Sequence, residues 1–367
     1  MISKKTINNI LSEYDSKKIR IGTICSHSAL QIFHGARQEG FATLGICTED
    51  RKKVYEAFPL ATPDEFLIVD NFKDIVKEKF QDNLRDKNVI IVPHGSFVEY
   101  VGPEALLTFF NVPMFGNRKT LEWEGDRSKQ RIWLEKADLK LPKEYKHPSE
   151  IDGKVFVKFS GAKGGKGFFT ANSETEYYKK LKEKVKKGII REEDSLNAAI
   201  QEFVSGVRYY NHYFFSIFEN YGFKVGKGAL ELLSMDKRIE PIDESQRGLP
   251  DVPEEFYDYT VTGNQPVIVR ESLLPKIFEM GNKTILSSIR LFPPGMLGAF
   301  CLETIYQPEK GFTVFEISAR IVAGTNLYPT NSPYSVYIFK EQMSTGRRIA
   351  RELKTGIETN ALDKIVF

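Results

Sequence analysis

The chain has 367 residues, and its 52 lysines and arginines nearly balance 49 acidic side chains, for a formal charge of +3. This balance argues against a dedicated nucleic-acid-binding protein, and a hydrophobic fraction of 41% argues against wholesale disorder. The cysteines Cys25, Cys47 and Cys301 are scattered and odd in number, which argues against a disulfide framework. No apolar run reaches about eighteen residues, so we expect no membrane span and a cytoplasmic location.

Four short apolar runs in the first hundred residues predict a parallel sheet. They lie at Ile19–Cys25, Thr43–Cys47, Phe66–Asp70 and Asn88–Pro93. Helical patterns such as Ala29–Glu39 and Asn71–Leu84 lie between them. Apolar strands that alternate with helices are typical of a sheet covered on both faces. We therefore expect a Rossmann-like domain over residues 1–120 with the strand order 3-2-1-4.

Polar residues follow the first and fourth of these strands. The first strand runs into CSHS, which contains His27 and Ser28, and the fourth into PHGS, which contains Ser96. In the predicted order these strands are neighbours where the winding reverses, the place at which open α/β sheets bind ligands. His27 and Ser96 would then face one crevice, and the helix capped by Ser28 would offer N–H groups to a phosphate. The alternative is that Ser28 only caps the helix and His27 is an ordinary surface residue.

A glycine- and lysine-rich stretch, SGAKGGKG, separates the apolar segments Val155–Phe159 and Gly167–Thr170 and predicts the tip of a hairpin. Its glycines, which include Gly164 and Gly165, would let backbone amides approach an anion closely. Lysines lie before and within the stretch, at positions 158, 163 and 166. The stretch has neither the Walker pattern nor the dinucleotide fingerprint. A solvated hairpin turn is the alternative.

The segments after this hairpin predict a second mixed region. A helix is expected over Ser173–Lys187 and a strand over Ala198–Val204. Two further strands are expected over Tyr209–Phe218 and Phe223–Leu233, the latter with Glu231 in an apolar setting. We therefore expect an α+β arrangement that follows the α/β domain.

The most specific signal is a pair of glutamates on a late hairpin. Strands are predicted at Ala299–Tyr306 and Phe312–Ile317, joined by the turn sequence PEKG. Counting outward from the turn places Glu303 opposite Glu316 on one face. Two opposed carboxylates in an apolar sheet need compensation, which magnesium with a phosphate ligand would provide. Pairing with lysines or exposure on a solvated face is the alternative.

These features, taken in chain order, resemble the ATP-grasp superfamily. They are a strand lysine, Lys158, a glycine-rich hairpin, the strand end QEFV and a late hairpin with Glu303, Glu316 and Arg320. The stretches SHSALQIFHGARQEGF, VPHGSFVEYVG, VKFSGAKGGKGFF, GNQPVIVRESLL and FEISARIVAGTN are more specific. They resemble the archaeal formate-dependent 5-formaminoimidazole-4-carboxamide ribonucleotide synthetases over nearly the whole length.

The resemblance implies a Rossmann-like domain before a two-lobed ATP-grasp fold, with lobes at 121–206 and 207–367. It implies an enzyme of purine biosynthesis that joins formate to the aminoimidazole carboxamide ribonucleotide through formyl phosphate. ATP and magnesium would be its cofactors, with manganese as an alternative to magnesium. A homo-oligomer is expected. The partners are small molecules, without nucleic acid or membrane.

The resemblance also implies a role for each site residue. The ribonucleotide would be held by His27, Ser28, Ser96 and Asn264. ATP would be held by Lys158, Lys163, Gly164, Gly165, Glu202, Phe203, Val204 and Glu231. Glu303 and Glu316 would bind the metal, while Arg320 and Lys158 would stabilise the transferring phosphoryl group.

Two positions depart from the wider superfamily. Ser318 stands where an asparagine commonly follows the second metal glutamate, and VRY follows the hinge where a ribose-binding glutamate is frequent. Two other functions remain as alternatives: a ligase for another carboxylate and amine, and a nucleotide sensor without turnover.

Overall fold

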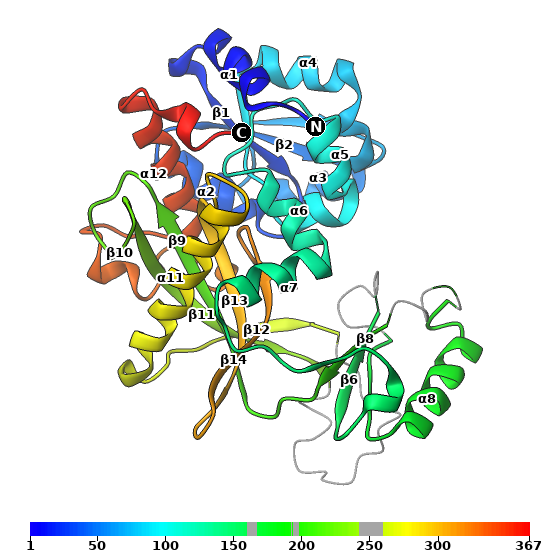
Figure 1. The fold of residues 1–367 in the computed structure, drawn as a ribbon. Coiled ribbons are helices and arrows are strands. Elements are labelled where there is room, and N and C mark those ends of the chain that lie inside the picture. Colours follow the sequence, from blue (N-terminus) through cyan, green and yellow to red (C-terminus); the bar gives the residue numbers. More distant parts are fainter. Residues whose placement is uncertain (160–166, 192, 194–197, 242–259) are drawn as a thin grey trace.

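The computed structural model describes residues 1–159, 167–191, 193, 198–241 and 260–367. Within these residues the chain forms three sheets with helices around them, which confirms the mixed α/β class. Figure 1 shows the N-terminal sheet at the top, a larger sheet below it, and a small lobe with α8 that projects to one side. None of the helices in the described ranges is long and apolar enough to cross a bilayer.

The N-terminal sheet has the predicted order β3-β2-β1-β4, and its strands are parallel. The strands are β1 (Arg20–Ile24), β2 (Ala42–Cys47), β3 (Glu65–Ile68) and β4 (Val89–Ile91). Helices α2 (Ala29–Gln38), α3 (Glu49–Glu56) and α4 (Glu78–Asp86) connect them. The helix expected over Asn71–Leu84 is interrupted, because Lys77 adopts an extended backbone between a 3-10 turn and α4.

The small lobe contains a sheet of order β5-β8-β6-β7. Its strands are β5 (Glu144–Tyr145), β6 (Val155–Lys158), β7 (Phe169–Ala171) and β8 (Ala199–Glu202). The predicted hairpin is confirmed, since β6 and β7 pair antiparallel with Val155 opposite Ala171. The predicted helix is α8 (Glu174–Lys186), capped by the side chain of Ser173.

The large sheet has the order β10-β11-β9-β13-β14, with β12 added beside β11. Its strands are β9 (Val207–Ser216), β10 (Phe223–Val225), β11 (Gly228–Ile239), β12 (Gly263–Pro266), β13 (Gly298–Gln307) and β14 (Gly311–Ser318). The single strand expected over Phe223–Leu233 is wrong: a turn at Gly226, whose φ is +57°, divides it into β10 and β11. β11 then continues six residues beyond Leu233, to Ile239.

Helices cover both faces of the large sheet. Helices α7 (Arg127–Lys136) and α11 (Leu274–Leu291) pack an apolar cluster against one face, with Trp133, Ile277 and Phe300 at its centre. The other face packs against the N-terminal unit and α12 (Thr345–Glu358). The remaining α-helices are α1 (Lys4–Glu13), α5 (Pro103–Thr108) and α6 (Lys119–Gly125).

Helix α12 returns the chain to the N-terminal unit, as its position beside α2 in Figure 1 shows. The two helices approach so closely that a Cβ atom on Gly35 would lie 2.4 Å from the carbonyl carbon of Gly346. The predicted division at residues 120 and 206 assigns this helix to the last lobe, yet the helix packs on the N-terminal unit. The exact boundaries stay a prediction.

A buried ion cluster anchors α12 on the sheet. The Arg348 guanidinium lies 2.8 Å from Glu231 and 2.9 Å from Glu352, and all three side chains are almost completely buried. Ser216 also donates a hydrogen bond to Glu352. Removal of the cation would leave two buried carboxylates without their charge partner, which is far costlier than loss of a surface ion pair.

We expect Arg348→Met to lower the free energy of unfolding by about 3–5 kcal/mol, because it leaves the charges of Glu231 and Glu352 uncompensated. Lys354→Met on the same helix is the control and should cost less than about 1 kcal/mol. Urea denaturation monitored by fluorescence measures both. Equal losses in the two variants would contradict this account of the cluster.

Candidate active site

A cavity of about 360 Å³ lies between the small lobe and the large sheet. Its size falls within the range of small-molecule sites, which run from about 300 to 1,000 Å³. Its lining combines four cations and four carboxylates: Arg127, Lys158, Arg208, Arg238, Glu202, Glu240, Glu303 and Glu316. Aromatic side chains supply much of the rest: Phe156, Phe168, Phe203, Tyr210 and Phe315. Such a lining suits a ligand that has both a planar ring and a polyanionic end.

The cavity brings together six residues that the sequence singled out. They are Lys158, Glu202, Phe203, Val204, Glu303 and Glu316. The segment that follows β8 contributes three of them as the chain passes from the small lobe to the large sheet. Lys163, Gly164 and Gly165 lie outside the described residues, as does most of the glycine- and lysine-rich stretch that contains them.

Lys158 ends β6 with its side chain in the cavity wall. Its ammonium nitrogen lies 5.4 Å from the ring centre of Phe315 and 5.8 Å from that of Phe156. Burial lowers the pKa of Lys158, and Arg127 lowers it further, while Glu316 opposes the shift. In the described part of the chain no carboxylate forms an ion pair with this lysine, so its charge is available to an anionic ligand.

Glu303 and Glu316 are direct cross-strand partners, as predicted. However, the hairpin does not reach this pairing by a direct count of residues outward from the turn. The turn pairs Gln307 with Gly311, and an irregularity between Glu303 and Thr304 then moves the pairing by one residue. Phe315 is the additional residue on β14, and both it and Glu316 line the cavity. Bulges of this kind re-aim side chains beside functional sites.

Glu303 is the more deeply buried of the two and has protein partners. Arg238 donates a hydrogen bond to Glu303 Oε1 at 2.7 Å, and the Ser318 hydroxyl donates to the same oxygen at 3.2 Å. Burial raises the pKa of Glu303 to about 7, Arg238 opposes this rise, and Glu316 adds to it. Pairing with lysines was the alternative to a metal. The structure instead shows Arg238 as the partner of Glu303, and its charge offsets one of the two opposed carboxylates.

The structure contradicts the assignment of Glu231 to the nucleotide. Its carboxylate is fully buried against Arg348 beneath α12, and it does not line the cavity. A bulge at Leu233 changes the strand register, beyond it β11 carries Asp236 and Arg238 on the same face, and Glu240 follows just after the strand ends at Ile239. Glu240 therefore takes the place of Glu231 as the acidic cavity residue of this segment, and Arg208 is its ion-pair partner.

A second polar region lies at the carboxyl ends of β1 and β4. The imidazole of His27 stacks on that of His94, with ring centres 5.2 Å apart. A Cβ atom placed on Gly95 would lie 2.9 Å from His27 Nε2, so the turn that carries Ser96 touches His27. The turn that carries Ser96 and the residue His27 therefore meet at the switch point of the strand order, in a polar region that we call the His27 recess, while their role in binding a substrate stays a prediction.

The local geometry of this turn differs from the prediction in one respect. Ser28 precedes α2, yet its side chain makes no capping hydrogen bond. Instead its hydroxyl lies 2.7 Å from His27 Nδ1. His27 itself adopts a left-handed backbone with φ of +53°, a strained conformation for a residue with a side chain. No serine side chain therefore caps the N–H groups in the first turn of α2.

Positive charge surrounds His27. Although the His27 side chain is exposed, desolvation by its neighbours lowers its pKa well below the usual range, and Arg320, His94 and Arg238 lower it further. Arg238 lines the large cavity and binds Glu303, whereas Arg320 pairs with Glu124 and is not among the residues that line this cavity. Arg238 therefore links the surroundings of His27 to the large cavity, and Arg320 acts electrostatically on both His27 and Glu303.

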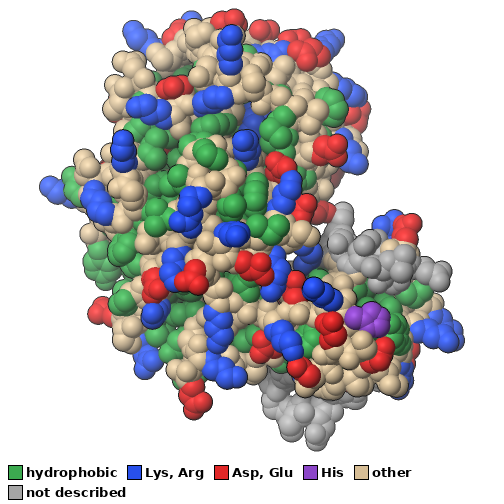
Figure 2. Space-filling model, viewed as in Figure 1, with side chains coloured by type: hydrophobic (Ala, Val, Ile, Leu, Met, Phe, Trp, Pro, Cys, Tyr) green, Lys and Arg blue, Asp and Glu red, His purple; other side chains and the backbone are tan. Residues whose placement is uncertain are grey.

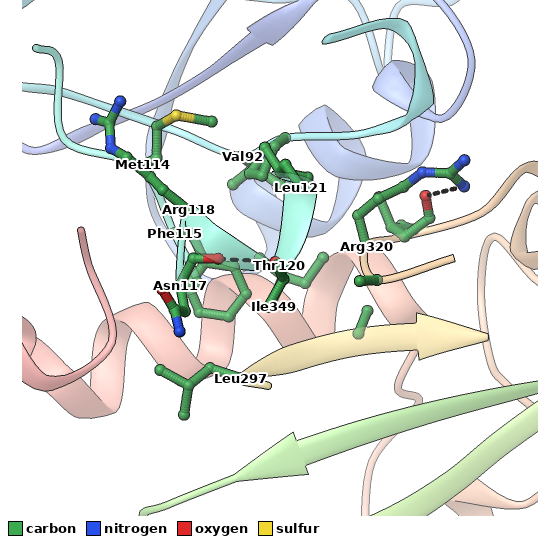
Figure 3. Close-up of a pocket in the computed structure, with 15 residues that line it drawn as sticks. Val92, Met114, Phe115, Asn117, Arg118, Thr120, Leu121, Leu297, Arg320 and Ile349 are labelled. Carbon is green, nitrogen blue, oxygen red and sulfur yellow. Dashed lines mark hydrogen bonds between the residues drawn. The ribbon is translucent and has the colours of Figure 1, made fainter. Parts of the chain in front are cut away.

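Arg320 is held in place by a carboxylate that the sequence did not single out. Its Nη2 atom lies 3.0 Å from Glu124 Oε1, and the Ala319 N–H donates to Glu124 Oε2 at 2.9 Å. Arg320 also borders a small apolar cavity of about 20 Å³, shown in Figure 3. There its guanidinium points away from Leu297 and Asn117. A cavity of this size holds a water molecule at most, so it is not the substrate site.

Asn264 lies on β12 opposite Arg238 of β11. Its amide nitrogen donates a hydrogen bond to Asp236 Oδ2 at 2.6 Å. Asp236 Oδ1 in turn lies 2.7 Å from His212 Nε2. The cross-strand register places Asn264 on the same face as Arg238 and hence beside the His27 recess. His212 is a buried member of this chain of hydrogen bonds.

Several site residues escaped the sequence analysis, namely Glu124, Arg127, Arg208, Asp236, Arg238 and Glu240. A signal for three of them was present. Polar residues alternate at 234, 236, 238 and 240, the period of a strand with one polar face. The predicted strand ended at Leu233 because its apolar run ends there. The two arginines Arg127 and Arg208 lie in charged sequence without such a period.

The raised pKa of Glu303 predicts a pH dependence of stability without ligands. Its pKa is 4.5 in a model peptide and about 7 here, so the folded protein binds this proton more tightly than the unfolded chain does. The resulting stabilisation is complete below the lower value and disappears as the pH rises through the higher one. We expect the melting temperature to fall more between pH 5.5 and 8 for the wild type than for Glu303→Gln. Parallel pH profiles in calorimetry would contradict the assignment.

Sequence comparisons place the chain in a family. A model for a domain of unknown function, DUF1297, matches residues 176–367, and one for a protein of unknown function, DUF1246, matches residues 21–145. A 5-formaminoimidazole-4-carboxamide-1-(beta)-D-ribofuranosyl 5'-monophosphate synthetase of Korarchaeum cryptofilum is 53% identical over 368 residues, with both chains fully covered. The enzyme of that name from Methanosarcina acetivorans is 50% identical, again over the full length of both.

Solved structures agree with this placement. The IMP biosynthesis protein PurP from Thermococcus kodakaraensis has a TM-score of 0.73 at 31% identity, over 95% of this chain and 100% of that one. The ADP complex of an N5-carboxyaminoimidazole ribonucleotide synthetase, at 12% identity, covers 91% of this chain and 76% of that one. Its TM-score of 0.60 shows a shared fold only. The chain has the ATP-grasp fold and belongs to the family of the 5-formaminoimidazole-4-carboxamide ribofuranosyl monophosphate synthetases.

Proposed function

We propose that this enzyme ligates formate to 5-aminoimidazole-4-carboxamide ribonucleotide, with cleavage of ATP to ADP and phosphate, in the synthesis of IMP. The observation that carries the proposal is the adjacency of two sites of different chemistry. One is a cavity with cations, opposed carboxylates and aromatic rings, and the other is a polar recess at the switch point of the N-terminal sheet. Arg238 lines the cavity and also lies close enough to His27 to lower its pKa.

ATP fits the larger cavity. Phe203 and Val204 would face the adenine from the segment between the lobes, and Glu240 would lie near the sugar. Lys158 and Arg127 would neutralise phosphate oxygens. A role for Lys163, Gly164 and Gly165 in ATP binding remains our expectation from the sequence alone. The exposed side chain of Phe203, at 36%, offers a ring face to a base.

The opposed carboxylates fit a divalent cation that is shared with ATP. Glu303 is desolvated and Glu316 faces it, a donor set of hard oxygens that magnesium accepts together with phosphate oxygens. Manganese has the same ligand preference. Burial and, to a smaller extent, repulsion by Glu316 raise the pKa of Glu303; a bound ion would offset both effects and would neutralise charge on the phosphates. The described residues contain no group of three or more candidate metal ligands, so the remaining ligands would come from ATP and water.

The ribonucleotide fits the recess. Its phosphate would accept hydrogen bonds from N–H groups in the first turn of α2 and from Ser96, while the Ser28 hydroxyl donates to His27 Nδ1 and orients the ring. His27 would donate from Nε2 as a neutral imidazole, since its pKa is lowered. Asn264 would contact the heterocycle from the opposite wall.

The residues between the two sites would stabilise the reaction itself. Formate attacks the γ-phosphorus, the bond to ADP breaks, and formyl phosphate forms. The amine of the ribonucleotide then attacks the formyl carbon, phosphate leaves with the C–O bond electrons, and the amine loses a proton. Arg320, fixed by Glu124, and Lys158 would hold the charge of the transferring group without reorganisation.

We also propose a location, an oligomeric state and a class of partners for this enzyme. We expect the enzyme to act in the cytoplasm, because all three cysteines are free. A homo-oligomer remains our expectation. Figure 2 shows basic and acidic side chains interspersed over the face in view, without the one-signed stripe of a nucleic-acid-binding protein.

We expect Glu316→Gln to reduce turnover about 100-fold or more while the fold persists, because the amide cannot replace a metal-binding carboxylate. Glu309→Gln in the exposed turn of the same hairpin is the matched control and should retain full activity. Turnover is followed as ADP release at saturating ATP and magnesium. Wild-type turnover of Glu316→Gln in dilute magnesium would contradict the metal assignment.

The test of the function uses isotopically labelled formate, ATP, magnesium and the ribonucleotide, without folate. Label should enter the 5-formamido product in a one-to-one ratio with ADP. Acetate should react about 10–200-fold less efficiently, the usual discrimination for one small apolar group. If another acid and amine are ligated while formate is not, the broader ligase function replaces this one. Nucleotide binding without any turnover would favour a sensor.

A further inference from the structure

The side-chain amide of Asn264 is held in one orientation. Its nitrogen donates to Asp236 Oδ2 at 2.6 Å, and a carboxylate can only accept. The carbonyl oxygen of Asn264 therefore points away from Asp236. An asparagine that could rotate would present either a donor or an acceptor, whereas this one presents an acceptor.

Asp236 is itself held from two sides. Its Oδ1 atom lies 2.7 Å from His212 Nε2, and His212 Nδ1 lies 2.7 Å from the Ser234 hydroxyl. A Cβ atom on Gly324 would lie 2.3 Å from Asp236 Oδ1, so the segment at Gly324 closes over the carboxylate. Asp236 is 1% exposed and His212 is 1% exposed. Neither side chain reaches solvent, so neither contacts a substrate directly.

The segment over Asp236 also contacts the His27 recess. Asn326, two residues after Gly324, donates a hydrogen bond to the backbone oxygen of His27 at 3.0 Å. On the other side, Asn264 pairs with Arg238, which lowers the pKa of His27. Asn264 therefore lies next to Arg238, and the segment that covers Asp236 contacts His27, so this chain of hydrogen bonds borders the region in which the ribonucleotide is proposed to bind.

We propose that Asp236, anchored by His212, is a positioning residue that fixes Asn264 with its carbonyl oxygen toward the acceptor substrate, where it selects an N–H donor. The inference rests on the proposed function for the identity of that substrate. An aminoimidazole carboxamide offers two such donors, its ring amine and its amide nitrogen. A substrate with a carbonyl or carboxylate at the same place would face the oxygen of Asn264 and be rejected.

Exchange of the side chains at positions 236 and 264 tests whether the carbonyl oxygen of Asn264, and not its amide nitrogen, faces the substrate. In the double variant Asp236→Asn with Asn264→Asp, the new amide at 236 accepts from His212 and donates to the new carboxylate at 264. That carboxylate still presents an oxygen to the substrate. The single variant Asn264→Asp places two carboxylates at the 2.6 Å contact, and Asn264→Ala removes the acceptor.

Calorimetry with the ribonucleotide measures the Kd, and steady-state kinetics gives the KM values for ribonucleotide and ATP. We expect Asn264→Ala and Asn264→Asp to weaken ribonucleotide binding about tenfold or more, as for one lost hydrogen bond. The double variant should recover to within about fivefold of the wild type, and the KM for ATP should stay unchanged in all three.

A double variant that binds no better than Asn264→Ala, although it melts at the wild-type temperature, would overturn the inference, since an amide donor would then be required. An altered KM for ATP would also count against it, because a merely structural role disturbs both sites. If the single variant does not fold, the comparison of the double variant with Asn264→Ala still decides. Failure of the wild type to bind the ribonucleotide would instead refute the proposed function.

Discussion

The contact between Arg238 and Glu303 is the constraint on which both halves of the site depend. Glu303 is buried opposite a second carboxylate, and without a cation the two charges would oppose the pairing of β13 with β14. Arg238 supplies that cation from β11, across the intervening strand β9. It also packs over the ring of Tyr210, 4.1 Å from its centre, so its direction is fixed by the sheet.

The same arginine ties the chemistry of the cavity to that of the recess. It borders the large cavity and lies close enough to His27 to lower its pKa. A ligand in either site therefore interacts with the charge of Arg238, which also acts on the other site. A bound cation at Glu303 and Glu316 would release part of the Arg238 charge toward the recess, where the second substrate is proposed to bind. The two sites thus share one electrostatic environment.

Helix α12 completes this arrangement from a distance. It seals one half of the polar face of the large sheet with a buried arginine and two carboxylates. It also packs against α2, the helix that follows His27. The face of the sheet is therefore divided into a closed half, which fixes the N-terminal unit, and an open half, which holds the candidate nucleotide site.

The sequence by itself determined the elements whose signals are local. Apolar runs gave the parallel strands and the 3-2-1-4 order, and the turn PEKG gave the hairpin that opposes Glu303 and Glu316. Tertiary structure alone decided the direction of side chains near irregularities. The bulge at Leu233 separates Glu231, which is buried beneath α12, from Asp236 and Arg238 farther along β11. The bulge at Phe315 brings Glu316 opposite Glu303, where the pairing that starts at the turn would otherwise place Phe315. The partners of Glu303, Arg320 and Asn264 come from strands and helices distant in sequence, and such contacts depend on packing, which no local pattern encodes.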